Sequence, residues 1–290
     1  MSYGVGADVA QSERDKRHPR REGRFRVRGH RLPLGSVTAA TRPGAETRGW
    51  AVATLLVLAA FGVLPPGVEL LGVRAALALA AAVLAALCWH RRASWTPVAM
   101  VTAVLLALLT AGVFWTVALA LAAAFLAVVR RWDRQIDGLS MARGRLPIWE
   151  IFACAAVTPV ALTGWVVVFD PDVSDLVESV PRVSAVLLIL GALAFAVLNA
   201  VFEEWLWRGL IQPQLTASFG CGLAIVLQAV SFGVAHTWGF PRGAAGVVLV
   251  TVWALMLGAL RQRSGGLAAP VLAHVVADAT IAVLVLTWWS

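Results

Sequence analysis

Residues 201–209 read Val-Phe-Glu-Glu-Trp-Leu-Trp-Arg-Gly, which places two acids and one base inside an otherwise apolar stretch. Ionisable side chains are costly in hydrocarbon, so a group of three in one apolar stretch indicates a functional site. Two pairs of residues spaced four apart follow in other apolar stretches, Phe232 with His236 and His274 with Asp278. The apolar surroundings of these three pieces decide the fold class, and the pieces themselves are the candidate site.

Composition excludes an ordinary soluble protein. Of the 290 residues, 60% are hydrophobic and 14% are charged, whereas soluble domains have about 25% charged residues. Apolar runs of roughly the 20 residues needed to cross a bilayer recur from Trp50 to the end of the chain. We therefore predict an all-α polytopic membrane protein, a bundle of about eight or nine transmembrane helices. The Ala- and Arg-rich composition, with Lys16 as the single lysine, suggests a bacterial source.

Residues 1–49 differ from the rest of the chain. They hold 11 Lys and Arg against 5 Asp and Glu, with Gly and Pro and no apolar periodicity. This composition predicts a disordered basic arm on the cytoplasmic side of the membrane. A basic tail before a first transmembrane helix follows the positive-inside rule and contacts anionic lipid, so we expect the lipid bilayer as its partner and no nucleic acid.

The apolar stretch from Pro97 to Val129 decides the number of crossings. As one helix it would be about 50 Å long, against roughly 30 Å for the hydrocarbon core. We favour a hairpin of two short helices that turns near residues 110–112, which gives nine crossings; a single tilted helix would give eight. With the hairpin, the basic loops and the arm share the cytoplasmic side, and the acidic loop 170–181 faces outside. This predicts a multi-pass protein of the inner (plasma) membrane with a cytoplasmic N-terminus.

The two adjacent glutamates differ in their local partners. Glu204 and Arg208 are four apart with the acid first, so they share a helix face and can neutralise each other. A structural role, holding the helix in place, is the simplest interpretation of this pair. Glu203 lies about 100° around the helix, where Trp207 occupies the position four residues on. A carboxyl group without a local partner in apolar surroundings is suited to act as a general base or acid.

His236 and His274 supply the candidate partners. A lone histidine in an apolar helix is more often structural than catalytic. If the helix of Glu203 turns near Phe219 into the next helix, however, Glu203 and His236 come to nearly the same depth. His274 and Asp278 also share one helix face, as two metal ligands, as a histidine with its orienting acid, or as hydrogen-bond groups around a reacting oxygen. Together these residues can gather around one water molecule that attacks a carbonyl group.

In this order the three pieces resemble the signature of the CAAX protease and bacteriocin-processing (CPBP, or Abi) family, whose pattern is E-E-x-x-x-R, then F-x-x-x-H, then H-x-x-x-N or H-x-x-x-D. The resemblance covers residues 183–288, which would form the catalytic transmembrane core, after N-terminal transmembrane helices in residues 50–180. It implies an intramembrane endopeptidase that hydrolyses peptide bonds of a membrane-associated peptide or protein in a cavity open to the cytoplasm. The substrate class, prenylated proteins included, does not follow from the motif.

The resemblance also implies roles for the site residues. Glu203 and His236 would activate the water, His274 and Asp278 would stabilise the oxyanion or bind a metal, and Glu204 and Arg208 would support the site. One divalent metal, zinc, is a possible cofactor, with four candidate ligands: Glu203, His236, His274 and Asp278. The sequence contains no H-E-x-x-H zinc motif. The three cysteines lack C-x-x-C spacing and are expected to be buried hydrophobes: Cys88, Cys154 and Cys221.

The same residues are compatible with two functional classes other than a protease. In a non-catalytic relative the polar cluster would be a structural knot or a scaffold for a partner. In a proton-coupled transporter the carboxylates and histidines would relay protons. The absence of evident repeats in the sequence disfavours the transporter.

Overall fold

The computed structural model describes residues 44–132, 142–178 and 180–289, all within one unit that spans residues 42–290. In these residues every regular element is a helix, so the predicted all-α class is confirmed. Seven helices are long and apolar enough to cross a membrane, and two shorter apolar helices accompany them. The described residues thus contain the nine apolar segments of the hairpin alternative. The predicted basic arm, residues 1–49, lies almost entirely outside the described residues.

The N-terminal helices are α1 (Ala45–Val63), α2 (Leu71–His90), α3 (Thr96–Thr110) and α4 (Trp115–Trp132), with a short 3₁₀ turn, η1 (Val68–Leu70), before α2. Helix α1 begins before the expected Trp50, because backbone hydrogen bonding extends past the apolar residues that mark the membrane segment. Helices α3 and α4 form the expected hairpin, and Gly112 between them has φ +79°, a left-handed conformation that glycine adopts without strain. Much of the predicted polar loop 130–145 lies outside the described residues.

The C-terminal helices carry the three polar pieces. They are α5 (Ile148–Phe169), the short α6 (Ser174–Glu178) in the acidic loop, α7 (Ala185–Glu204), η2 (Trp205–Ile211), α8 (Gln212–Phe219), α9 (Cys221–Ala235), α10 (Gly243–Ser264) and α11 (Ala268–Trp289). Segment η2 is a π-helix that joins α7 to α8 without a break. The sequence predicted neither α6 nor this π segment. The predicted turn near Phe219 lies at Gly220, whose φ of +86° ends α8 and starts α9.

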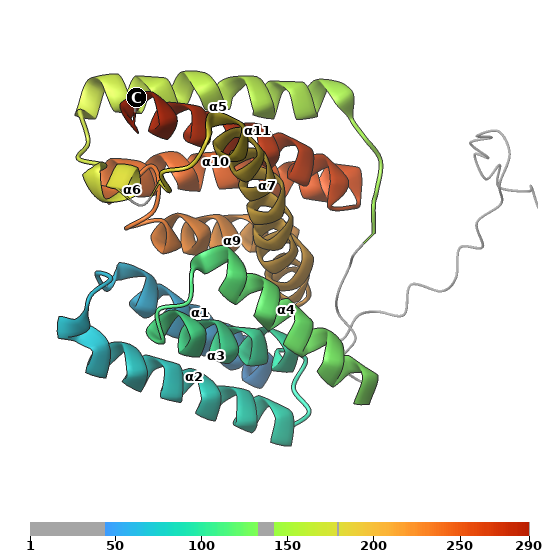
Figure 1. The fold of residues 1–290 in the computed structure, drawn as a ribbon. Coiled ribbons are helices and arrows are strands. Elements are labelled where there is room, and N and C mark those ends of the chain that lie inside the picture. The colour runs from blue at the N-terminus through green and yellow to red at the C-terminus, as the bar shows by residue number, and fades with distance from the viewer. Residues whose placement is uncertain (1–43, 133–141, 179, 290) are drawn as a thin grey trace, which may run out of the picture. The chain divides into compact units, whose positions relative to one another are not determined.

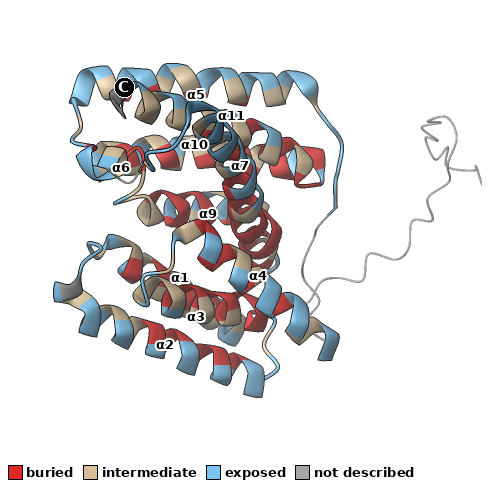
Figure 2. Cartoon of the chain, viewed as in Figure 1, coloured by how far each residue is buried: buried red, intermediate tan, exposed pale blue. Residues whose placement is uncertain are grey.

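Packing between the two groups of helices creates the interior of the site. Helix α9 packs on α10, α11 packs on α5 and α7, and the N-terminal layer meets this group through α1 on α9 and α4 on α7 (Figure 1). Figure 2 shows exposed residues on the outer sides of α2 and α5 and buried residues on the inner sides of the helices. Many exposed side chains are large and apolar, such as Leu79 and Val160, which is the surface that a bilayer requires.

Candidate active site

The paired glutamates stand at the end of α7, where the helix passes into the π segment. Glu203 is 3% exposed and Glu204 is fully buried. A π turn has one extra residue per hydrogen-bonded ring and is frequent at functional sites. All seven residues of η2, Trp205–Ile211, are buried, so the irregular turn lies inside the protein and carries Arg208 into the same interior.

Glu204 is the centre of a buried ionic network. Its Oε1 accepts from Arg208 Nη1 at 2.8 Å, which confirms the expected i, i+4 pair. The same oxygen lies 2.8 Å from His274 Nδ1. A carboxylate only accepts, so His274 Nδ1 carries the proton and the other ring nitrogen, Nε2, is directed elsewhere. Glu204 therefore orients His274 as well as neutralising Arg208, a contact between distant helices that the sequence did not predict.

Arg208 is held on its other sides by neutral groups. Its Nη2 donates to the carbonyl oxygen of Ala254 at 3.3 Å, and its Cζ lies 4.6 Å from the ring centroid of Phe232. Phe232 also makes edge contacts with Trp207 and His274, at 5.4 and 6.1 Å between ring centroids. Phe232, the phenylalanine of the second sequence piece, is thus a packing centre that positions the charged groups around it.

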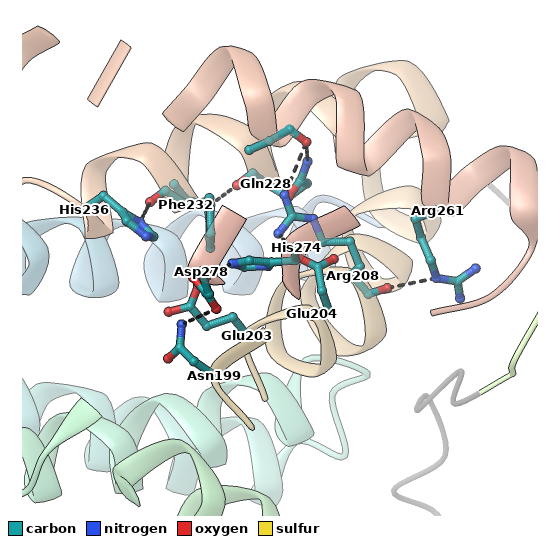
Figure 3. A network of polar contacts seen from close by, with 12 residues as sticks. Asn199, Glu203, Glu204, Arg208, Gln228, Phe232, His236, Arg261, His274 and Asp278 are labelled. Atoms are coloured by element: carbon teal, nitrogen blue, oxygen red, sulfur yellow. Dashed lines mark hydrogen bonds and ion pairs between the residues drawn. The ribbon is translucent and has the colours of Figure 1, made fainter. Parts of the chain in front are cut away.

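Glu203 has one oxygen anchored and one oxygen open. Its Oε1 accepts from the indole Nε1 of Trp115 in α4 at 2.6 Å. Its Oε2 is buried and has no hydrogen-bond partner among the described residues. This oxygen lies 3.5 Å from His274 Nε2, which in turn lies 3.7 Å from Asp278 Oδ1. Figure 3 shows the three side chains converging on one small region of the interior.

Asp278 is tied to α7 and α4 through an amide. Its Oδ2 accepts from Asn199 Nδ2 at 3.2 Å, and Asn199 Oδ1 accepts from the Thr116 hydroxyl at 2.9 Å. Sequence reasoning missed Asn199, Thr116 and Trp115. Asn199 could have been found, because it is a polar residue four positions before Glu203 and on the same helix face. The two α4 residues carry no such local signal.

His236 lies beside the network and is not bonded to it. It follows the last residue of α9, and its Nδ1 lies 2.9 Å from the carbonyl oxygen of Phe232. Because a carbonyl accepts, Nδ1 is the donor and Nε2 of the neutral ring is free to accept. In the described part of the chain no hydrogen bond or ion pair joins His236 to Glu203. Both residues line the same cavity.

Two cavities meet at this cluster. The larger, about 750 Å³, is lined by Trp115, Asn199, Glu203, His236 and Asp278 together with apolar residues of α7 and α11. The smaller, about 210 Å³, lies between α5, α10 and α11 and is lined by His236, His274 and Asp278. The polar groups therefore border spaces large enough for part of a substrate, inside walls that are mostly apolar.

The candidate metal ligands do not form a metal-binding group in this arrangement. Among the described residues, no set of three or more His, Cys, Asp and Glu side chains is placed to hold a metal ion. The nearest donors are already engaged, since His274 Nδ1 faces Glu204 and Glu203 Oε1 accepts from Trp115.

Comparison with known proteins matches the C-terminal part of the chain to a protein family. Residues 185–280 match the model of the Rce1-like family, described as type II CAAX prenyl endopeptidase Rce1-like. The match covers about a third of the chain and includes all three polar pieces. No curated protein and no solved structure matches. The C-terminal part of the chain is therefore similar to this family of endopeptidases, as the motifs indicated, and the similarity implies a protease that acts on a peptide substrate.

Proposed function

We propose that this Rce1-like protease hydrolyses a peptide bond of a membrane-associated substrate inside the bilayer, with a water molecule that Glu203 activates. The observation that carries the proposal is the asymmetry of the Glu203 carboxylate. One oxygen is fixed by Trp115, and the other is buried, has no hydrogen-bond partner in the described residues, and belongs to a side chain that lines the larger cavity. A carboxylate so placed can accept a proton from water while its orientation stays fixed.

The remaining residues can be assigned to the same reaction. As the water oxygen attacks the carbonyl carbon, one of its protons passes to Glu203 Oε2. The free Nε2 of His236 accepts a hydrogen bond from the same water and orients it. When protonated, His274 donates from Nε2 to the oxyanion that forms on the carbonyl oxygen. The C–N bond then breaks, and the proton held by Glu203 passes to the leaving nitrogen.

Asp278 and Glu204 act on His274 and not on the substrate in this scheme. Glu204 accepts from Nδ1 and so holds the ring with Nε2 toward Glu203. Asp278 lies at the other side of Nε2, 3.7 Å away, and is itself held by Asn199. An ionised aspartate cannot donate to an oxyanion. Its proposed role is therefore to stabilise the protonated form of His274.

Zinc is the alternative way to activate the water. If a metal is present, the four candidate ligands are Glu203, His236, His274 and Asp278, and a bound divalent ion would lower the pKa of its water. Metal analysis of the purified active protein tests this alternative. If the active protein contains stoichiometric zinc, and His274→Ala loses both the zinc and the activity, then the metal and not Glu203 activates the water.

The substrate is proposed to approach from the membrane. Apolar residues of α7 and α11 line the larger cavity, so a substrate segment with apolar side chains would fit it. The distribution of basic segments supports a cytoplasmic N-terminus in the inner (plasma) membrane. Labelling of single cysteines introduced at Arg182 and Arg263, from the two sides of sealed vesicles, tests this orientation.

Peptide cleavage in lipid nanodiscs tests the proposed function. A library of apolar peptides is incubated with the purified protein, and products are identified by mass spectrometry. We expect Glu203→Gln and His236→Ala to abolish cleavage, whereas the matched control Glu69→Gln, which removes an exposed glutamate in η1, keeps it. Cleavage that persists unchanged in Glu203→Gln would refute the proposal. If the wild type cleaves no peptide and Glu203→Gln lowers the thermal stability, the results would instead favour a non-catalytic scaffold.

A further inference from the structure

Two loops border the larger cavity at the end where His236 lies. The first connects α5 to α7 and contains α6, and it contributes Leu176 and Pro181 to the cavity wall. The second connects α9 to α10 and contributes Trp238 and Phe240. His236 is the first residue of the second loop, and its backbone is no longer helical, with φ −92° and ψ 9°. The position of its imidazole therefore depends on how this loop is held.

Arg242, at the far end of the second loop, is bonded to both loops. Its Nη1 and Nη2 donate to Asp175 Oδ1 and Oδ2 at 2.8 and 3.1 Å, a bidentate pair with α6. Nη1 also donates to the carbonyl oxygen of Asp172 at 3.3 Å, and Nε donates to that of Gly239 at 3.4 Å. This use of the planar guanidinium cannot be copied by lysine, which presents a single nitrogen.

A short chain of contacts links this ion pair to His236. The amide of Gly239 donates to the carbonyl oxygen of His236 at 3.0 Å, and Gly239 in turn accepts from Arg242. The amide of Gly243 donates to Thr237 at 3.0 Å, which closes the loop on itself. Between these bonds Phe240 packs edge-on against Trp165 of α5, with 5.1 Å between ring centroids. Movement of Arg242 would therefore shift the backbone that carries the histidine.

We propose that Arg242 is a positioning residue of the protease. Its bidentate ion pair with Asp175, called the clasp from here on, fixes the loop from which His236 faces the cavity. The proposal rests on the proposed function, because it assigns the clasp an effect on the same reaction. The side chains of Arg242 and Asp175 are 21% and 64% exposed, and an ion pair this accessible contributes little to global stability. The hydrogen bond from Arg242 keeps the pKa of Asp175 below its ordinary value, so the pair is charged at neutral pH.

Steady-state kinetics of clasp variants measure the effect on the reaction. Arg242→Ala and Asp175→Ala are each expected to lower kcat by about 10-fold to 100-fold, the range for a displaced catalytic group, with KM within about twofold. Arg242→Lys should recover only part of the loss. The exchanged pair Asp175→Arg with Arg242→Asp should recover more activity than either single change. Arg182→Ala, which removes an exposed cation of the first loop that makes no contact with Arg242 in the described residues, is the matched control and should leave kcat unchanged.

Hydrogen–deuterium exchange supplies a readout that does not need activity. Peptides that contain residues 236–243 should exchange at least severalfold faster in Arg242→Ala and Asp175→Ala than in the wild type or in Arg182→Ala. Asp172→Asn is a second control, because Arg242 hydrogen-bonds to the backbone carbonyl of Asp172 and the asparagine oxygen can still accept from the Ser174 amide. The melting temperature of all these variants should stay close to that of the wild type.

The two measurements separate the possible failures. Unchanged exchange in Arg242→Ala would overturn the clasp, whatever the activity. Faster exchange with unchanged kcat would overturn the positioning role. A uniform drop in melting temperature, without recovery in the exchanged pair, would show a general structural defect and also overturn it. If the wild type cleaves no peptide, the proposed function fails. Hydrogen–deuterium exchange of residues 236–243 then decides alone whether the Arg242–Asp175 ion pair holds the loop.

Discussion

Replacing Glu204 with glutamine tests the division of roles between the two adjacent glutamates. The change keeps the size of the side chain but removes the negative charge that faces Arg208 Nη1 and His274 Nδ1, both at 2.8 Å. Arg208 is fully buried, so its charge would lose its counter-ion without gaining water. Breaking a buried ion pair in this way costs about 3–5 kcal/mol. At about 2–4 °C per kcal/mol, the melting temperature should fall by roughly 6–20 °C.

The assay is thermal unfolding of the purified protein in detergent, followed by the fluorescence of its 13 tryptophans. Glu203→Gln is the matched control on the neighbouring residue. Its amide oxygen can still accept from Trp115, and Arg208 keeps its counter-ion Glu204, so its melting temperature should stay within about 3 °C of the wild type. The double variant Glu204→Gln with Arg208→Met removes both charges and should recover much of the lost stability, yet remain inactive because His274 has lost the negative charge that favours its protonated form.

Two results would refute this reasoning. If Glu204→Gln melts like the wild type while Glu203→Gln melts lower, the structural and functional roles of the glutamates are reversed. If the double variant is no more stable than Glu204→Gln, the loss does not come from an uncompensated charge on Arg208. Either result would show that the Glu204–Arg208 ion pair does not stabilise the fold in the way proposed.

Three further substitutions test other parts of the structure. Trp115→Phe removes the donor to Glu203 Oε1, and kcat/KM should fall about tenfold, the value of one hydrogen bond to a charged group. Gly191→Leu adds a side chain where a Cβ meets nothing within 4 Å, on the wall of the larger cavity; KM for apolar peptides should rise severalfold with kcat kept. Gly233→Ala would place a Cβ against the Thr251 hydroxyl, and unfolding measurements should show a loss of about 1–3 kcal/mol.

The membrane-spanning helices could be predicted from the sequence, because the length and the apolar composition of a segment are enough to recognise them. The stretch 97–129 is too long for one crossing, and the hairpin follows from that single comparison with the bilayer. The π segment after Glu204 had no such signal. The backbone of Gly209 in that segment lies close to Leu267, so that a Cβ there would be 3.2 Å from Leu267 Cδ1. Contacts of this kind form only when helices from distant parts of the sequence pack together.

The candidate site divides in the same way. The pairs spaced by four, Glu204 with Arg208 and His274 with Asp278, are local, and helix geometry alone places each on one face. The contact of Glu204 with His274 is different, because it depends on how α7 and α11 are rotated about their axes. No periodicity in one segment contains that information. The ionisable residues of the site could therefore be named from the sequence, while the acceptor of His274 could not.

Helix α4 adds a component of the site that lies outside the family match. The indole of Trp115 anchors Glu203 and the hydroxyl of Thr116 anchors Asn199, and both residues precede the matched residues 185–280. A buried carboxylate without hydrogen bonds is costly in apolar surroundings, so the Trp115 indole offsets the burial of Glu203 and fixes its direction, while Thr116 fixes Asn199. The N-terminal hairpin is therefore part of the site, and not only a membrane anchor. The matched segment alone would leave both oxygens of the proposed base without a donor.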